Sequence, residues 1–208
     1  MTLIDEKMDC AEWWVRYGHS SGLAELYAKT DHHYDPKRGI LNQYHLEGDV
    51  WTHTQMVLNQ LDQVRTSTGS YQFYFQYEDW VELYALAFFH DLGKCYTRTE
   101  DHEKTKVHFI GHGGVSALKA PDYLVDLKFD DSTISRMAFI ICHHQEMFGP
   151  VNKQETLFPK VPDAYSKEKP EVLRKLFVLM YADATGRISS RKETGLESGY
   201  LFLAKSLI

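Results

Sequence analysis

The run Ala85-Leu86-Ala87-Phe88-Phe89-His90-Asp91-Leu92-Gly93-Lys94 places an imidazole and a carboxylate side by side at the end of an otherwise apolar segment. Such a segment predicts a helix that is apolar nearly all round and therefore lies buried at the centre of the molecule. Asp79 is placed to cap this helix, and Gly93 to stop it. Burying a His-Asp pair costs free energy unless the pair is compensated, and a divalent metal is a frequent compensation.

Helices are also predicted on both sides of this run. Asp49 is placed to cap a helix over residues 50–66, and His53 borders its apolar stripe. A later helix begins near residue 171, and Asp183 continues its inward stripe. A carboxylate is therefore expected to point into the core from this helix.

Between these segments, the chain carries further helices and one long loop. Asp130 or Asp131 is expected to open a helix that ends at His143-His144. Residues 106–110 read as a short extended segment or loop, and residues 150–170, with four prolines, read as a long surface loop.

These segments together predict an all-α fold of one domain, with the metal site between its central helices. We expect a core at about residues 43–187, a helical extension at 1–42 with a break near residues 18–22, and a closing helix within 188–208, at about 193–204.

Composition restricts the classes of partner. The formal net charge of -6 argues against a protein that coats nucleic acid, but a small phosphorylated substrate or one end of an RNA is compatible with it. The 3 cysteines form no CxxC pattern, which argues against a disulfide framework and a cysteine zinc site. The N-terminus lacks the apolar core of a signal peptide, and no uncharged apolar run could cross a bilayer. We therefore expect a cytoplasmic location and no membrane partner; the oligomeric state is not predicted.

Histidines and aspartates recur on or beside these apolar helix faces. Nitrogen and oxygen ligands of this kind suit Mn, Fe, Co, Ni or Zn, whereas Mg is disfavoured by so many imidazoles. One ion would use His53, His90, Asp91 and Asp183; two ions, bridged by Asp91 and about 3.5–4 Å apart, would add further ligands. The full set of predicted ligands is His53, His90, Asp91, His112, His143 and Asp183.

Each of these residues also has a purely structural explanation. A single histidine on an apolar helix face is more often a hydrogen-bonded core residue than a metal ligand. The pair His143-His144 could straddle a helix boundary, and Asp183 could form an ion pair with Arg187 one turn later. The order and the helical placement of all the residues together favour the metal site.

The order His, His-Asp, His, His, Asp on successive helices resembles the HD-domain superfamily of metal-dependent phosphohydrolases. Four segments are similar, more closely, to the HD domain of bacterial tRNA nucleotidyltransferases (CCA-adding enzymes), over about residues 43–187. The nucleotidyltransferase head of those enzymes is absent, so CCA addition is not predicted; the Gly-Tyr-Pro motif of another branch is absent too. The four segments are His45-Leu46-Glu47-Gly48-Asp49-Val50-Trp51-Thr52-His53-Thr54, Phe89-His90-Asp91-Leu92-Gly93-Lys94 with Thr97-Arg98-Thr99-Glu100, His108-Phe109-Ile110-Gly111-His112, and Asp183-Ala184-Thr185-Gly186-Arg187.

The resemblance implies hydrolysis of a phosphoester of a nucleotide or an RNA end, such as a 2′,3′-cyclic phosphate, by a metal-activated water. Asp91 is then a ligand and bridge, and Lys94 contacts a phosphate oxygen. Arg98 and Arg187 are expected to bind phosphate, and His144, where it is not a ligand, to protonate the leaving group.

The remaining polar residues receive supporting roles or none. We expect His45, Glu47 and Asp49 to support ligands or cap helices. The histidines at positions 19, 32, 33 and 102 carry no argument for function and are expected at the surface. Two alternative functions stay open: a catalytically silent HD module that binds nucleotide or RNA, and a di-iron oxygenase, which Lys94 disfavours.

Overall fold

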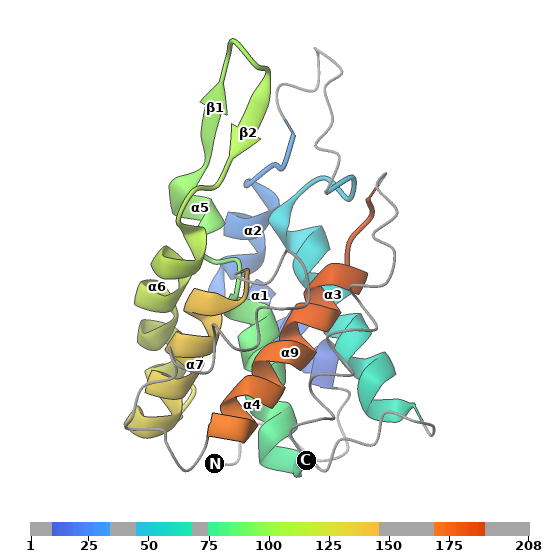
Figure 1. The fold of residues 1–208 in the computed structure, drawn as a ribbon, viewed down its shortest axis with the longest axis vertical. Coiled ribbons are helices and arrows are strands. Elements are labelled where there is room, and N and C mark those ends of the chain that lie inside the picture. Colours follow the sequence, from blue (N-terminus) through green and yellow to red (C-terminus); the bar gives the residue numbers. More distant parts are fainter. Residues whose placement is uncertain (1–9, 34–44, 68–74, 146–168, 190–208) are drawn as a thin grey trace.

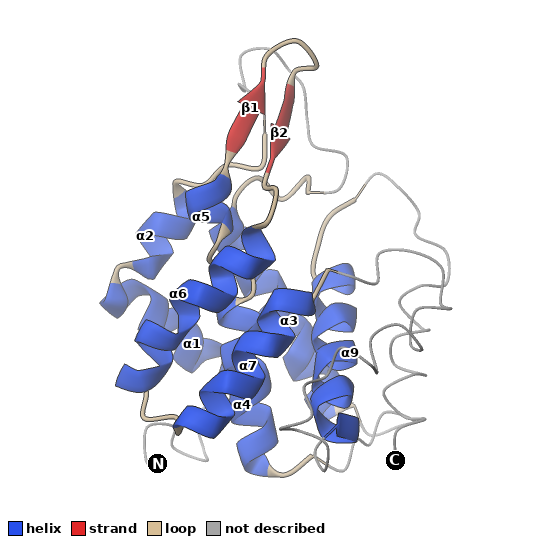
Figure 2. Cartoon of the chain, turned by 60° about the vertical axis from the view of Figure 1, so that its left-hand side comes forward, coloured by secondary structure: helices blue, strands red, loops and turns tan. Residues whose placement is uncertain are grey.

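The computed structural model of the protein describes residues 10–33, 45–67, 75–145 and 169–189. Apart from one small sheet, the regular structure of these residues is helical, and the all-α prediction is confirmed (Figures 1 and 2). The predicted loop at 150–170 lies almost entirely, and the closing helix at 193–204 wholly, outside the described residues. The elements are α1 Cys10–Ser21, α2 Leu23–Ala28, α3 Val50–Thr66, α4 Tyr77–Phe89, α5 Lys94–Thr97, β1 Thr99–Asp101, β2 Lys106–His108, α6 His112–Asp126, α7 Asp131–His143 and α9 Lys169–Thr185.

Helix α4 lies at the centre and contacts α1, α3, α7 and α9. Its second half is buried on every side, as the apolar run predicts. The Tyr27 hydroxyl donates to the carbonyl of Phe88 at 3.0 Å and so ties α2 to the end of α4. The site residues that follow α4 therefore start from a rigid position.

The caps of the helices agree in part with the sequence. Asp49 caps α3 by accepting a hydrogen bond from the Thr52 amide at 2.9 Å, and Asp130 caps α7 in the same way. The prediction that Asp79 caps α4 is wrong by three residues. Gln76 is the N-cap, and the Asp79 carboxylate accepts from the Gln76 amide in a capping box.

A two-stranded hairpin extends beyond the helices at one end (Figure 1). Its strands β1 and β2 are antiparallel, with Thr99 opposite His108 and Asp101 opposite Lys106. The extended segment predicted near residues 106–110 corresponds to β2. Strand β1 was not predicted, because Thr99–Asp101 has no apolar residue that would produce an alternating pattern.

Among the described helices, none combines the length and the apolar character that a membrane span requires.

Gly93 does not stop α4 by a left-handed cap, because its φ is -64°. Its role is close packing: a Cβ built on Gly93 would lie 2.1 Å from the His112 carbonyl oxygen and 2.6 Å from the Ser116 amide. The Gly93 amide also donates to the Ser116 hydroxyl at 2.7 Å. The absence of a side chain therefore lets the start of α6 approach the His-Asp pair.

Substitution of Gly93 by Ala is expected to lower the free energy of unfolding by about 1–3 kcal/mol, because backbone atoms of α6 must move. Urea unfolding monitored by circular dichroism measures this loss. The matched control is Gly114→Ala in α6, where a Cβ would meet no atom within 4 Å. That variant should be neutral or stabilised by up to about 1 kcal/mol, and equal losses in both variants would contradict the packing role.

Candidate metal site

Helices α3, α4 and α9 bring four predicted ligands together. The Nε2 atom of His53, in the first turn of α3, lies 3.0 Å from Asp183 Oδ1 and 3.5 Å from Asp91 Oδ2. The Nε2 atom of His90 lies 3.3 Å from Asp91 Oδ2 and 3.9 Å from Asp183 Oδ1. All four side chains are buried. Two buried imidazoles and two nearly buried carboxylates form a donor set that suits a divalent transition metal.

The other oxygen of Asp91 faces a second pair of histidines. Asp91 Oδ1 lies 3.2 Å from Nε2 of His112, at the start of α6, and 3.8 Å from Nε2 of His144, just after α7. Both of these histidines are buried. Asp91 therefore stands between two groups of imidazoles, with one carboxylate oxygen directed at each.

Backbone carbonyls fix the orientation of three of these rings. The Nδ1 atoms of His90, His112 and His144 each lie 2.7 Å from the carbonyl oxygen three residues earlier in the chain. A carbonyl oxygen only accepts, so each Nδ1 must carry a proton, and in the neutral form of each ring Nε2 would offer its lone pair to a metal in the cluster. These three Nε2 atoms are buried and have no hydrogen-bond partner among the described residues. A bound metal is what such unpaired nitrogens fit.

The structure does not bring His143 to this cluster. Its half-buried ring packs against Phe139, with ring centroids 4.4 Å apart, while the ring of His144 turns inward. The place in the cluster that was predicted for His143 is therefore occupied by His144. The sequence left this choice open because α7 ends at this point, and successive helical residues point about 100° apart.

The predicted phosphate-binding cations lie in different surroundings. Lys94 is buried, and its Nζ atom lies 2.7 Å from Asp91 Oδ2. Arg98 instead donates to the carbonyls of Asp31 and His33 and pairs with Glu100, so the structure does not bring it to the cluster. Arg187 is half-buried and follows α9 one turn after Asp183.

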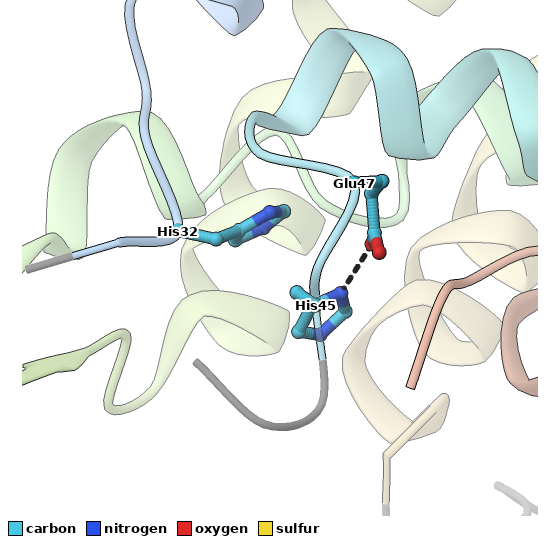
Figure 3. Close-up of side chains that lie close together, drawn as sticks. All are labelled: His32, His45 and Glu47. Atoms are coloured by element: carbon cyan, nitrogen blue, oxygen red, sulfur yellow. Dashed lines mark hydrogen bonds and ion pairs between the residues drawn. The ribbon is translucent and has the colours of Figure 1, made fainter. Parts of the chain in front are cut away.

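Glu47 supports His53 from the opposite side. Glu47 Oε1 lies 3.1 Å from His53 Nδ1 and 2.7 Å from His45 Nδ1, and Glu47 Oε2 accepts a hydrogen bond from the Ile188 amide at 3.0 Å. Figure 3 shows the Glu47 carboxylate pointing at the His45 ring, with His32 beside them. The expectation that these residues support a ligand fits this arrangement, since a carboxylate on Nδ1 directs Nε2 toward a metal.

Sequence reasoning missed His32. It was expected at the surface, but its side chain is fully buried, and its Nε2 atom lies 3.2 Å from Lys94 Nζ. No helical periodicity marks His32, because it follows α2 in an irregular segment. The adjacent pair His32-His33 was the one available signal, and it carries no spacing that points to a ligand.

The electrostatics of the cluster favour bound cations. Burial would raise the pKa of Asp91, but His90 and Lys94 hold it well below its usual range. The pKa of Asp183 is also lowered: burial opposes this shift, and the hydrogen bond from His53 outweighs it. Burial would lower the pKa of His53, but its hydrogen bonds to Asp183 and Glu47 raise it to about 9. A proton on His53 thus takes the place that a metal would hold.

A family model described as HD domain matches residues 50–187. The chain belongs to the HD-domain family. The matched region of this HD domain contains all six clustered residues, from α3 to the end of α9. No curated protein and no solved structure matches the chain. The similarity to the HD domain of tRNA nucleotidyltransferases therefore stays a prediction, as do the roles of the individual site residues.

Glu47→Gln is expected to weaken divalent metal binding by about 10–100-fold, because it removes the charge that orients His53. Titration of the metal-free protein with Mn²⁺ or Zn²⁺, followed by calorimetry, measures the change. Glu103→Gln, at an exposed position between the two hairpin strands, is the control. Unchanged affinity in Glu47→Gln would show that Glu47 serves only the fold.

Metal affinity is expected to rise by about tenfold per pH unit between pH 6.5 and 9, because the ion displaces a proton from His53. In the metal-free protein, the contribution of His53 to the free energy of unfolding changes with pH in the opposite direction. Protonated His53 contributes stability that is present below its ordinary pKa of 6.5 and is lost as the pH rises through 9. Thermal unfolding in chelator across this range should show the decline, and His53→Gln should flatten it. A metal affinity independent of pH would contradict the exchange.

Proposed function

We propose that this HD domain is a metal-dependent phosphohydrolase that cleaves a phosphoester of a nucleotide or of an RNA end. The observation that carries the proposal is the position of Asp91. Its two oxygens face separate pairs of buried imidazoles, and Lys94 lies 2.7 Å from it. This is the arrangement expected for two ions bridged by one carboxylate beside a cation for phosphate.

The proposed ligands divide into two groups. His53, His90, Asp91 and Asp183 would hold one ion, and Asp91, His112 and His144 a second. Bound divalent ions of this kind lower the pKa of a coordinated water and neutralise the charge of a phosphate. The backbone carbonyls keep three imidazoles in the tautomer that presents Nε2. The buried donor set excludes bulk water from the ligands themselves.

Lys94 would bind a phosphoryl oxygen. Its ammonium lies in the core beside the ligand Asp91, where a positive charge interacts more strongly with a phosphate than it would at the surface. His144 faces Asp91 and is proposed as a ligand, so the earlier alternative of a proton donor is not carried forward. Arg187 stays a proposed phosphate contact, whereas Arg98 is committed to backbone carbonyls.

The substrate class rests on chemistry and resemblance. The net charge of -6 is compatible with a small phosphorylated molecule or one RNA end and unfavourable for coating a nucleic acid. The segments that resemble tRNA nucleotidyltransferases support a 2′,3′-cyclic phosphate as the first compound to test. Mn, Fe, Co, Ni and Zn are the metals that the imidazole-rich set supports.

The test combines elemental analysis of the purified protein with a hydrolysis screen on cyclic and linear nucleotides. Each of the five metals is added in turn to the metal-free protein. Asp91→Asn is expected to lose at least about a hundredfold in kcat/KM and to lose bound metal, because it removes the shared ligand. Asp122→Asn, on an exposed position of α6, should match the original protein.

Four outcomes would contradict the proposal. Absence of hydrolysis with all five metals would do so, and nucleotide binding that raises Tm without product formation would favour a silent binding module. Oxygen consumption by the iron-loaded protein would favour an oxygenase. Equal activity of Asp91→Asn and the original chain would show that any hydrolysis arises elsewhere.

A further inference from the structure

We infer that His32 is a positioning residue that fixes the ammonium of Lys94 where the phosphoryl group of the substrate binds. The inference rests on the proposed function and adds to it a residue outside the region that the family model matches. Its basis is one contact, between Lys94 Nζ and His32 Nε2 at 3.2 Å, and the surroundings that hold that contact in place.

The backbone and ring of His32 are both held. The His32 amide donates to the Gly48 carbonyl at 2.8 Å, next to the bridge between Asp31 and Asp49. Its ring stacks on the ring of His45, with centroids 4.3 Å apart. It also makes a T-shaped contact with the ring of Phe109, with centroids 5.5 Å apart. A fully buried ring that packs against two neighbouring rings keeps its Nε2 atom at a fixed position.

The proton positions follow from the contact itself. An ammonium only donates, so the Nε2 atom of His32 must accept, and the proton of the neutral ring lies on Nδ1. Burial and the charge of Lys94 both lower the pKa of His32, so the ring stays neutral and keeps its acceptor. His32 Nδ1 is buried and has no hydrogen-bond partner among the described residues. This costs free energy, which a purely packing side chain such as Phe would avoid.

The acceptor on His32 matters because the oxygens of Asp91, the other partner of Lys94, would also bind metal ions. Among the described residues, Lys94 Nζ has two polar partners, Asp91 Oδ2 and His32 Nε2, and it also lies 5.5 Å from the ring centroid of Phe109. In the proposed enzyme, the lone pairs of Asp91 are shared with metal ions. His32 then remains as the partner of Lys94 that binds no metal, and the third N–H is left for a phosphoryl oxygen.

The group His32, His45 and Glu47 has the donor types of a metal site, but its geometry argues against one. The rings of His32 and His45 are stacked, with only 21° between their planes (Figure 3). An ion lies close to the plane of each imidazole that binds it, and nearly parallel stacked planes do not meet at a nearby point. Glu47 is also engaged with His53, and Lys94 adds a positive charge next to His32.

The experiment measures kcat, KM and the inhibition constant of inorganic phosphate for the metal-loaded protein, with two substitutions at His32. His32→Phe keeps the ring shape and removes the acceptor; we expect kcat/KM and phosphate affinity to fall by about tenfold or more, with metal content unchanged. His32→Gln should recover most of this loss, because its amide oxygen reaches about as far as Nε2. It also keeps the test valid if the Phe variant does not fold.

Two controls separate positioning from a general effect on the fold. In a Lys94→Met background, His32→Phe should have little further effect on phosphate affinity, because the two residues act through one contact. His33→Phe changes the adjacent half-buried histidine, which contacts the His45 carbonyl and not Lys94, and should leave phosphate affinity near that of the original protein.

The outcomes distinguish this inference from the proposed function. If the original protein hydrolyses phosphoesters but His32→Phe matches it, or if His33→Phe loses as much as His32→Phe, the positioning role is wrong and the function stands. Additive effects of His32→Phe and Lys94→Met would also overturn it. If the original metal-loaded protein neither hydrolyses a phosphoester nor binds phosphate, both proposals fail.

Discussion

The structure depends on one carboxylate that is shared between two sets of imidazoles. Asp91 is buried, and its oxygens lie 3.2 to 3.8 Å from the Nε2 atoms of four histidines. Those histidines come from α3, α6 and the ends of α4 and α7. Removing so many polar groups from water is unfavourable unless they are paired, so the helices can pack here only around compensating charges. The same pairing between Asp91 and the histidines therefore determines both how the helices pack and which side chains form the site.

The way the histidines are held explains why helix ends form the site. His90, His112 and His144 lie at or next to helix ends, and each Nδ1 donates to a carbonyl three residues back. The carbonyls of Ala87 and Ile141 lie in the last turns of α4 and α7, where helical carbonyls lack a backbone partner within the helix, whereas the carbonyl of Phe109 lies in the segment just before α6. The same contact sets the tautomer and aims Nε2 inward. Close approach of α6 to this point also requires Gly93, which leaves no room for a Cβ.

The sequence predicted the helical fold because α3, α4 and α9 carry long apolar stripes, and it placed His53, His90, Asp91 and Asp183 on or beside them. Choosing between His143 and His144 required the rotation at the end of α7, which no periodicity specifies. His32 was missed for a related reason: its burial comes from contacts with His45 and Phe109, distant in sequence, in a segment without regular structure. Hydrophobic periodicity predicts which faces of helices and strands are buried, but it does not predict burial in irregular segments.

Residues that precede the matched family region also contact the site. His32, His45 and Glu47 all precede residue 50, yet Glu47 contacts the proposed ligand His53, and His32 contacts Lys94. The Glu47 carboxylate also accepts a hydrogen bond from the Ile188 amide, so the segment before α3 is joined to the segment that follows α9, beyond the proposed ligand Asp183. The cluster carried by the helices is thus covered by a second layer of residues, in which His32 contacts Lys94 and Glu47 contacts His53. Because that layer touches the site without supplying any of the proposed metal ligands, substitutions in it can change the surroundings of Lys94 while leaving the proposed ligand set intact.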